Sequence, residues 1–134
     1  MRFFVDLNIF LDVLLIREPH FKFSRLVMDW SDGQDVWMAW HSLATLDYVG
    51  NKLAGKPKTN RFIVRLLEIF EISPTDTRSA RFARMLPMTD FEDALQVAAA
   101  DMVKADFILT RNLKDYKKSP IPAMAPEEFV ERFV

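Results

Sequence analysis

Acidic and amide side chains stand at the points of the chain where apolar, strand-like runs give way to other structure. Asp6 comes directly after one such run, and Asp93 lies in the opening turn of a helix-forming segment that is otherwise rich in Ala, Leu and Val. Asn112 and Asp115 follow a second apolar run. Carboxylate and amide oxygens are the ligands that Mg²⁺ and Mn²⁺ prefer. These residue types therefore predict a divalent-cation site that activates a water molecule.

The composition excludes several classes of protein and several kinds of site. The chain has 134 residues, half of them hydrophobic, which is enough for a domain with a core and excludes a disordered chain. It has no cysteine, which excludes disulfides, thiol catalysis and cysteine-ligated metals. Its two histidines, His20 and His41, are too few for a histidine-rich metal site. The longest apolar run, residues 9–16, is interrupted by Asp12 and too short to cross a bilayer, and no signal peptide precedes it, so we expect a soluble, cytoplasmic protein.

Strand-like and helix-like patterns alternate along the chain. We expect strands over residues 2–6, 36–39, 71–72, 107–110 and 121–124, and helices over residues 7–16, 20–30, 43–53, 60–70, 76–87, 91–104 and from 126 onward. Ser42 and Thr59 are predicted to cap two of these helices, and Thr89 or Asp90 a third. The alternation predicts an α/β fold in a single domain over residues 1–134, a three-layer sandwich with a mostly parallel, short-stranded central sheet.

This topology predicts that the polar residues meet. In open α/β sheets, ligands bind outside the carboxyl ends of the strands. Asp6 and the segment 110–112 lie at such ends, and the helix N-termini that carry Asn8 and Asp93 point to the same edge. Carboxylates gathered there repel one another, so at least one pKa should rise unless a cation lies among them.

Several short motifs carry a resemblance to a known family. They are Val5-Asp6-Leu7-Asn8 with residues 11–15, Asp90-Phe91-Glu92-Asp93-Ala94, residues 110–116, Pro120-Ile121-Pro122 and Pro126-Glu127-Glu128-Phe129. In this order and at this spacing the sequence resembles the PIN domain, the small nuclease fold of VapC-type toxins and related proteins, over essentially the whole chain. The resemblance implies a Mg²⁺-dependent (or Mn²⁺-dependent) ribonuclease, usually a homodimer and often inhibited by an antitoxin protein.

Two positions depart from the family pattern. The family usually carries an acid, commonly Glu, early in the helix after the second strand, where this chain has Thr45. Asp47 lies two residues on, roughly 200° around a helix, and should face elsewhere. Asn112 stands where the family often has Asp, with Asp115 three residues further. The departures leave open an alternative, a PIN-like module that binds RNA or a protein and cleaves little. A phosphoacceptor module of the receiver type is disfavoured, because no mid-chain strand ends in a lone Asp with a later strand ending in Lys.

These observations give each candidate an expected role. The catalytic residues are Asp6, Asp93 and Asp115; the metal ligands are Asp6, Asp93 and Asn112; the supporting residues are Asn8, Thr45 and Thr110; and the RNA-binding residues are Arg111, Lys114, Lys52 and Lys56. For Asp6 and Asp93 the alternative is a helix cap or a first-turn acid that interacts with the helix dipole. For the basic residues it is an ordinary solvated surface, and His41 is expected to pack or hydrogen-bond.

Large apolar residues outside these motifs divide into two groups. Trp37, Trp40 and Tyr48 are expected in the core rather than as platforms on which RNA bases stack. Phe21 and Phe23, in the expected second helix, suggest a surface that binds a second copy or another partner.

Overall fold

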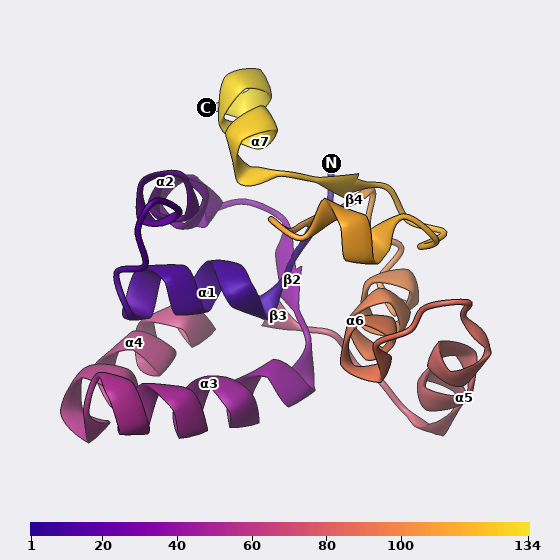
Figure 1. Cartoon of the computed structure of the whole chain (residues 1–134), viewed down its shortest axis with the longest axis horizontal. Helices are drawn as coiled ribbons and strands as arrows, with labels where there is room; N and C mark the ends of the chain where they lie inside the picture. The colour runs from indigo at the N-terminus through magenta and orange to yellow at the C-terminus, as the bar shows by residue number, and fades with distance from the viewer.

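The computed structural model describes residues 1–134 and contains one parallel sheet with helices on both faces (Figure 1). The elements are β1 (Phe3–Val5), α1 (Leu7–Leu14), α2 (Phe21–Ser31), β2 (Val36–Met38), α3 (Trp40–Leu53), α4 (Lys56–Ile69), β3 (Glu71–Ile72), α5 (Thr77–Met85), α6 (Phe91–Met102), β4 (Phe107–Leu109), the 3₁₀ helix η1 (Leu113–Tyr116), β5 (Ala123–Met124) and α7 (Pro126–Phe133). The three-layer α/β architecture is thereby confirmed. No helix combines the length and the hydrophobicity that crossing a membrane requires.

The five strands run in the order β3-β2-β1-β4-β5, and every neighbouring pair is parallel. Phe3 of the central strand pairs with Val36 on one side and with Phe107 on the other. The chain first builds the sheet outward from β1 through β2 to β3, and then crosses back to place β4 on the other side. The order in which strands are added to the sheet therefore reverses between β1 and β4, although the two strands are parallel. Open parallel sheets form a ligand crevice at such a point.

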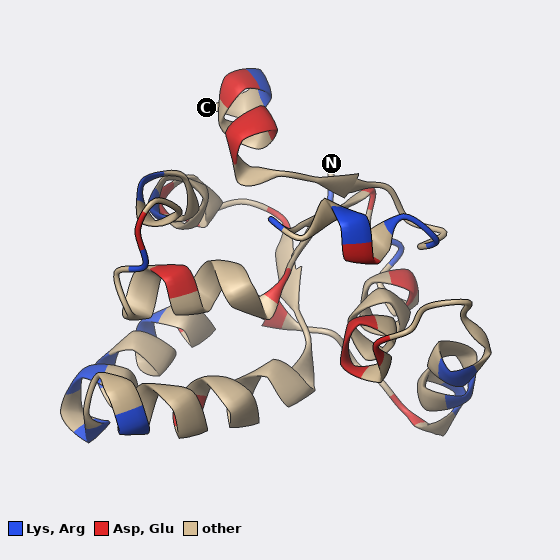
Figure 2. Cartoon of the chain, in the orientation of Figure 1, with Lys and Arg blue, Asp and Glu red and all other residues tan.

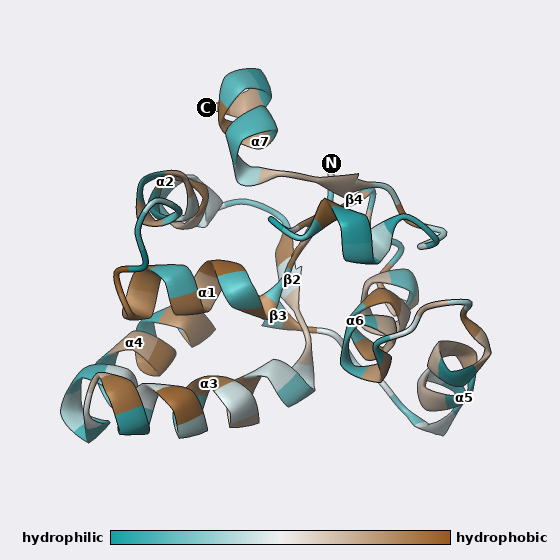
Figure 3. Cartoon of the chain, in the orientation of Figure 1, coloured by the Kyte–Doolittle hydropathy of each residue, from teal (hydrophilic) through white to brown (hydrophobic).

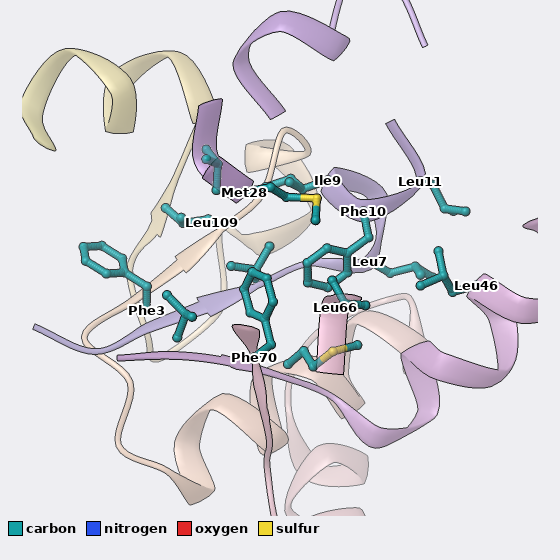
Figure 4. Packing of buried hydrophobic residues seen from close by; sticks show 14 of the residues in the cluster. Phe3, Leu7, Ile9, Phe10, Leu11, Met28, Leu46, Leu66, Phe70 and Leu109 are labelled. Atoms are coloured by element: carbon teal, nitrogen blue, oxygen red, sulfur yellow. The ribbon is translucent and has the colours of Figure 1, made fainter. Parts of the chain in front are cut away.

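The two faces of the sheet are covered by different side chains. Phe3 and Val5 of β1 enter the larger core cluster, whereas Phe4 between them enters the cluster under α6, as the two-residue period of a strand requires. The larger cluster includes Phe10 and Phe70, whose rings meet edge to face (Figure 4). Apolar residues accordingly concentrate along the strands and the inner helix faces (Figure 3).

Two predicted helix caps are wrong. Helix α3 begins at Trp40, so Ser42 lies inside its first turn, where its hydroxyl is buried without a partner. Helix α4 begins at Lys56 after Gly55, whose φ of 90° suits glycine, and Thr59 is likewise buried inside the helix. Thr59 fills space between α4 and α3, where it lies against Gly50. The prediction for α6 is confirmed, because the Asp90 carboxylate accepts from the backbone N–H of Asp93 at 3.0 Å.

Two of the aromatic residues predicted in the core are on the surface. Trp40 is 67% exposed and Tyr48 is 69% exposed, while Trp37 is partly buried. The buried stripe of α3 consists of Ser42, Leu46 and Gly50, four residues apart. Because Trp40 and Tyr48 are each two positions from a member of that stripe, they lie roughly 200° away from it. Phe21 and Phe23 are partly buried.

Candidate active site at the carboxyl edge of the sheet

Asp6 is the centre of the candidate site. It follows β1, is only 1% exposed, and makes no side-chain capping bond to α1. Its carboxylate accepts from the Gln96 amide and from the Thr110 hydroxyl, the latter at 2.9 Å. Burial raises the pKa of Asp6, against the lowering effect of these hydrogen bonds and of one from Asn8. Asp6 therefore serves as a buried acceptor that joins the N-terminal strand to α6 and β4.

Gln96 belongs to the site, although the sequence reasoning did not single it out. It lies one turn after Asp93 on α6 and is 1% exposed, with its amide nitrogen bound to Asp6. Its carbonyl oxygen is buried and has no hydrogen-bond partner. The signal in the sequence was a lone amide in the otherwise apolar run Ala94 to Ala100, three residues from an acid.

Asp93 stands at the entrance of the site in the first turn of α6. The Asp90 carboxylate caps the helix by accepting from the backbone N–H of Asp93. The Asp93 carboxylate does not take part in this cap and is half-buried. Burial raises the pKa of Asp93 to about 7, with further contributions from the negative charges of Asp90, Asp6 and Asp115. A weak bond from the Tyr116 hydroxyl, at 3.4 Å, acts in the opposite direction. The expectation that crowding raises at least one carboxyl pKa is met here.

The loop after β4 forms the side of the site opposite α6. The Thr110 hydroxyl donates to Asp6 and accepts from the backbone N–H of Asn112 at 3.1 Å. Asn112 precedes η1, in which Asp115 is exposed and Tyr116 is buried. The loop thus brings Thr110 into contact with Asp6, as predicted from the strand order, and it brings Asp115 close enough to Asp93 for its charge to act on that carboxylate. Tyr116 was not foreseen; burial, then the nearby carboxylates, raise its pKa, so its hydroxyl stays a proton donor.

The first turn of α3 forms the third wall. His41 lies close to the backbone of Glu92 at the start of α6; burial lowers its pKa, and its buried Nε2 has no hydrogen-bond partner. Of the two roles expected for it, the structure agrees with packing. Thr45 lies one turn further along α3 and is partly buried, while Asp47 is exposed and accepts from Asn51.

The four basic residues predicted to bind RNA lie in three different environments. Arg111 is bound to the fully buried Asp12 by two bonds of 2.9 and 3.2 Å, so its guanidinium already has a carboxylate partner. Lys114 is exposed on η1 beside Asp115. Lys52 lies in the last turn of α3, about 18 Å along the helix from the turn that meets α6, and Lys56 begins the next helix. The structure does not bring Lys52 and Lys56 to the site.

The donor set suits Mg²⁺ or Mn²⁺ in its chemistry. Asp6, Asp93, Asn112 and Asp115 offer only hard oxygen ligands, and the negative charges of Asp90, Asp6 and Asp115, which add to the effect of burial on the pKa of Asp93, are ones that a cation would offset. No three His, Asp or Glu side chains are arranged to hold one ion by themselves. Mg²⁺ commonly binds through one or two carboxylates and keeps several waters, so the pair Asp6 and Asp93 fits this cation.

Comparisons with known proteins bear on the family and the fold of the chain. The family model described as "PIN domain" matches residues 2–114. No curated protein sequence is a significant match. Among solved structures, DNA-bound VapBC from Salmonella typhimurium superposes with a TM-score of 0.73 at 15% identity, over 94% of this chain and 98% of that one. VapBC2 from Rickettsia felis, bound to a promoter DNA fragment, gives 0.70 at 17% identity over 93% and 98% of the two chains. FitAcB from Neisseria gonorrhoeae gives 0.67 at 14% identity over 93% and 98%. At these identities the structures establish a shared fold.

Proposed function

The chain belongs to the PIN domain family, and from this premise we propose that it is a ribonuclease that hydrolyses RNA phosphodiester bonds with Mg²⁺ or Mn²⁺. The observation that carries the proposal is the charge environment of Asp93, whose pKa is raised to about 7 by burial and by the carboxylates of Asp90, Asp6 and Asp115. Such a concentration of like charge at a ligand-binding edge is typical of a functional site.

Each residue would have a distinct part in the reaction. Asp6 and Asp93 would hold the cation, with Asn112 as a further oxygen donor from the loop. The bound cation would supply an activated water and stabilise charge on the leaving oxygen. Gln96 and Thr110 orient the Asp6 carboxylate through their hydrogen bonds.

The remaining side chains would handle protons and substrate. Asp115 is exposed and close enough to influence Asp93, so its carboxylate can accept a proton from the attacking water. Lys114 beside it can bind an RNA phosphate without reading sequence. The Tyr116 hydroxyl holds one oxygen of Asp93. Arg111 acts at a distance, because its bond to Asp12 fixes the loop that carries Thr110 and Asn112.

We further propose that the protein is the toxin of a toxin–antitoxin pair, inhibited by an antitoxin protein and homodimeric. Support comes from the likeness of the fold, over nearly the whole chain, to the VapBC and FitAB proteins.

A second function has specific support. Thr45 stands where the family usually has an acid, and no three acidic or histidine side chains are arranged around one metal position. A PIN-like module that binds RNA or a protein partner and cleaves little would have these features.

Replacing Asp93 by Asn tests the first function. Cleavage of unstructured single-stranded RNA should require Mg²⁺ or Mn²⁺ and stop with a chelator. Asp93→Asn should lower the rate by at least about 100-fold, the lower end of what a positioned catalytic group contributes. Mn²⁺ should raise the Tm of the wild type, because a ligand that binds only the native state stabilises it, and should do so less in the variant.

The matched control is Asp101→Asn, the same substitution at an exposed position near the other end of α6. It should cleave like the wild type. Equal cleavage by Asp93→Asn and the wild type would remove Asp93 from the mechanism. RNA binding without cleavage at any metal concentration would favour the second function.

A further inference from the structure

An exposed tryptophan stands next to the candidate active site. Trp40 is the first residue of α3, directly after β2, and two thirds of its side chain faces solvent. It lies between two surface hollows, one of about 270 Å³ bounded by residues 72–75 and one of about 250 Å³ that reaches Ala80 and Leu95. Tryptophan is seldom left in water without a use, because it carries the largest apolar surface of any side chain.

Trp40 is fixed close to the carboxylates by its neighbour. His41 lies close to the backbone of Glu92, which precedes Asp93, and Leu95 lines the same hollow as Trp40. The indole therefore stands beside the first turn of α6, the turn that carries Asp93. It is also at the carboxyl end of β2, on the edge where the site lies.

Helix α5 and its cap border the same hollow through Asp76, Ser79 and Ala80, and the helix carries positive charge on its exposed surface. Its three arginines, Arg78, Arg81 and Arg84, are exposed, and none forms an ion pair. Figure 2 shows the basic residues of this helix in blue. Arg84 lies one helical turn from Ala80, which lines the hollow, and its guanidinium is 5.1 Å from the centre of the half-exposed Phe91 ring. The acid at the start of this helix, Asp76, is occupied as the cap that accepts from Ser79.

We propose that Trp40 is a platform on which one base of a single-stranded RNA stacks, while the α5 arginines bind the adjoining phosphates. An exposed aromatic ring beside unpaired cations is the combination by which proteins hold single strands, since every base has a face that can stack. The proposal rests on the function proposed above and deepens it by assigning the RNA a path from α5, across Trp40, to Asp93. It also replaces the expectation that Trp40 belongs to the core.

The test compares the binding of two RNA probes in chelator, where no cleavage occurs. One probe is a short fluorescent oligouridylate and the other has the same phosphates with abasic nucleotides. Trp40→Ala should weaken binding of the oligouridylate by about 5- to 150-fold, the range expected for the loss of one stack, and leave the abasic probe unchanged. Trp40→Phe should bind nearly as well as the wild type. Arg81→Gln should weaken both probes alike and lower the salt dependence.

The matched control is Tyr48→Ala, which removes an equally exposed aromatic side chain two turns further along α3 and should leave both affinities unchanged. If Trp40→Ala does not fold, Trp40→Leu keeps an apolar side chain without a stacking face and should weaken the oligouridylate in the same way. Unchanged oligouridylate binding by these Trp40 variants would overturn the inference.

The two proposals can fail separately. Metal-dependent cleavage that needs Asp93, with unchanged RNA affinity and KM in Trp40→Ala, would overturn the stacking role and leave the ribonuclease in place. RNA binding that depends on Trp40 in a protein that never cleaves would support the stacking role and overturn the ribonuclease.

Discussion

At the scale of single residues, the site shows how a charged side chain can be structural although its neighbours do chemistry. Asp12 and Arg111 both belong to motifs shared with the family, yet they bind each other. Asp12 is completely buried and accepts two bonds from Arg111 and one of 3.1 Å from Ser24. A buried carboxylate persists only when such partners replace its water.

Asp12→Ala should be strongly destabilising. It leaves the partly buried Arg111 guanidinium without its carboxylate, and breaking a buried pair by removing one partner costs about 3–5 kcal/mol. Urea denaturation of the variant measures this loss. Asp47→Ala is the control, because Asp47 is exposed and accepts one bond from Asn51, so its effect should stay within about 0.5 kcal/mol. Equal stability of the two variants would contradict the structural role of Asp12.

At the scale of elements, the sequence predicted the order of strands and helices but not all of their starts. Asp90 was one of the two residues predicted to cap α6, because an acid before a helix-forming run suits that position. Ser42 was misread because α3 begins two residues before it. Thr59 was misread because a short hydroxyl side chain can equally fill a narrow gap between helices, as it does against Gly50. Whether such a side chain caps a helix or fills a gap depends on the distance between α3 and α4, and that distance is set by tertiary packing.

Gly50 is the residue that allows this close packing. A Cβ added to Gly50 would lie 2.6 Å from Thr59 Oγ1 and 2.8 Å from Leu14 Cδ2. Overpacking of this kind costs about 1–3 kcal/mol, and the better helix propensity of Ala offsets up to about 1 kcal/mol. Gly50→Ala should therefore lower the Tm, and adding Thr59→Ala should recover part of the loss. A double variant no more stable than Gly50→Ala alone would contradict the steric explanation.

At the scale of the whole molecule, the parts of the site that could be predicted are those that topology alone brings together. Asp6 and Thr110 follow strands that are neighbours in the sheet, so their meeting follows from the strand order. Gln96 and Trp40 could not be assigned, because their roles depend on how α6 and α3 are rotated about their axes. Lys52 was misplaced since charge along a sequence says nothing about distance along a helix.

The stability of the metal-free protein should depend on pH through the site. The pKa of Asp93 rises from 3.8 to about 7 on folding, and burial raises that of Asp6 as well. Between these pH values the folded state binds more protons than the unfolded chain, so the stabilising contribution is complete below about pH 4 and is lost as the pH rises toward 7. With chelator present, the Tm should fall between about pH 5 and about pH 7.5.

Asp93→Asn provides the comparison for this pH dependence. The variant keeps the shape of the side chain without a titrating group, so its Tm should fall less over the same interval. It should also be at least as stable as the wild type near neutral pH, because the repulsion from Asp6, Asp90 and Asp115 is relieved. Identical pH profiles for the two proteins would show that Asp93 titrates as it does in an unfolded chain.

The strand order also links the pocket to the progress of translation. Asp6 emerges from the ribosome early, but the groups that hold its carboxylate, Gln96 and Thr110, lie far along the chain. The strand that completes the crevice, β4, ends only at Leu109. A nascent chain thus carries one carboxylate of the site and no pocket until residue 93 has been added. If the finished protein cuts RNA, a chain that is still being made cannot cut the message that encodes it before translation has reached the final stretch.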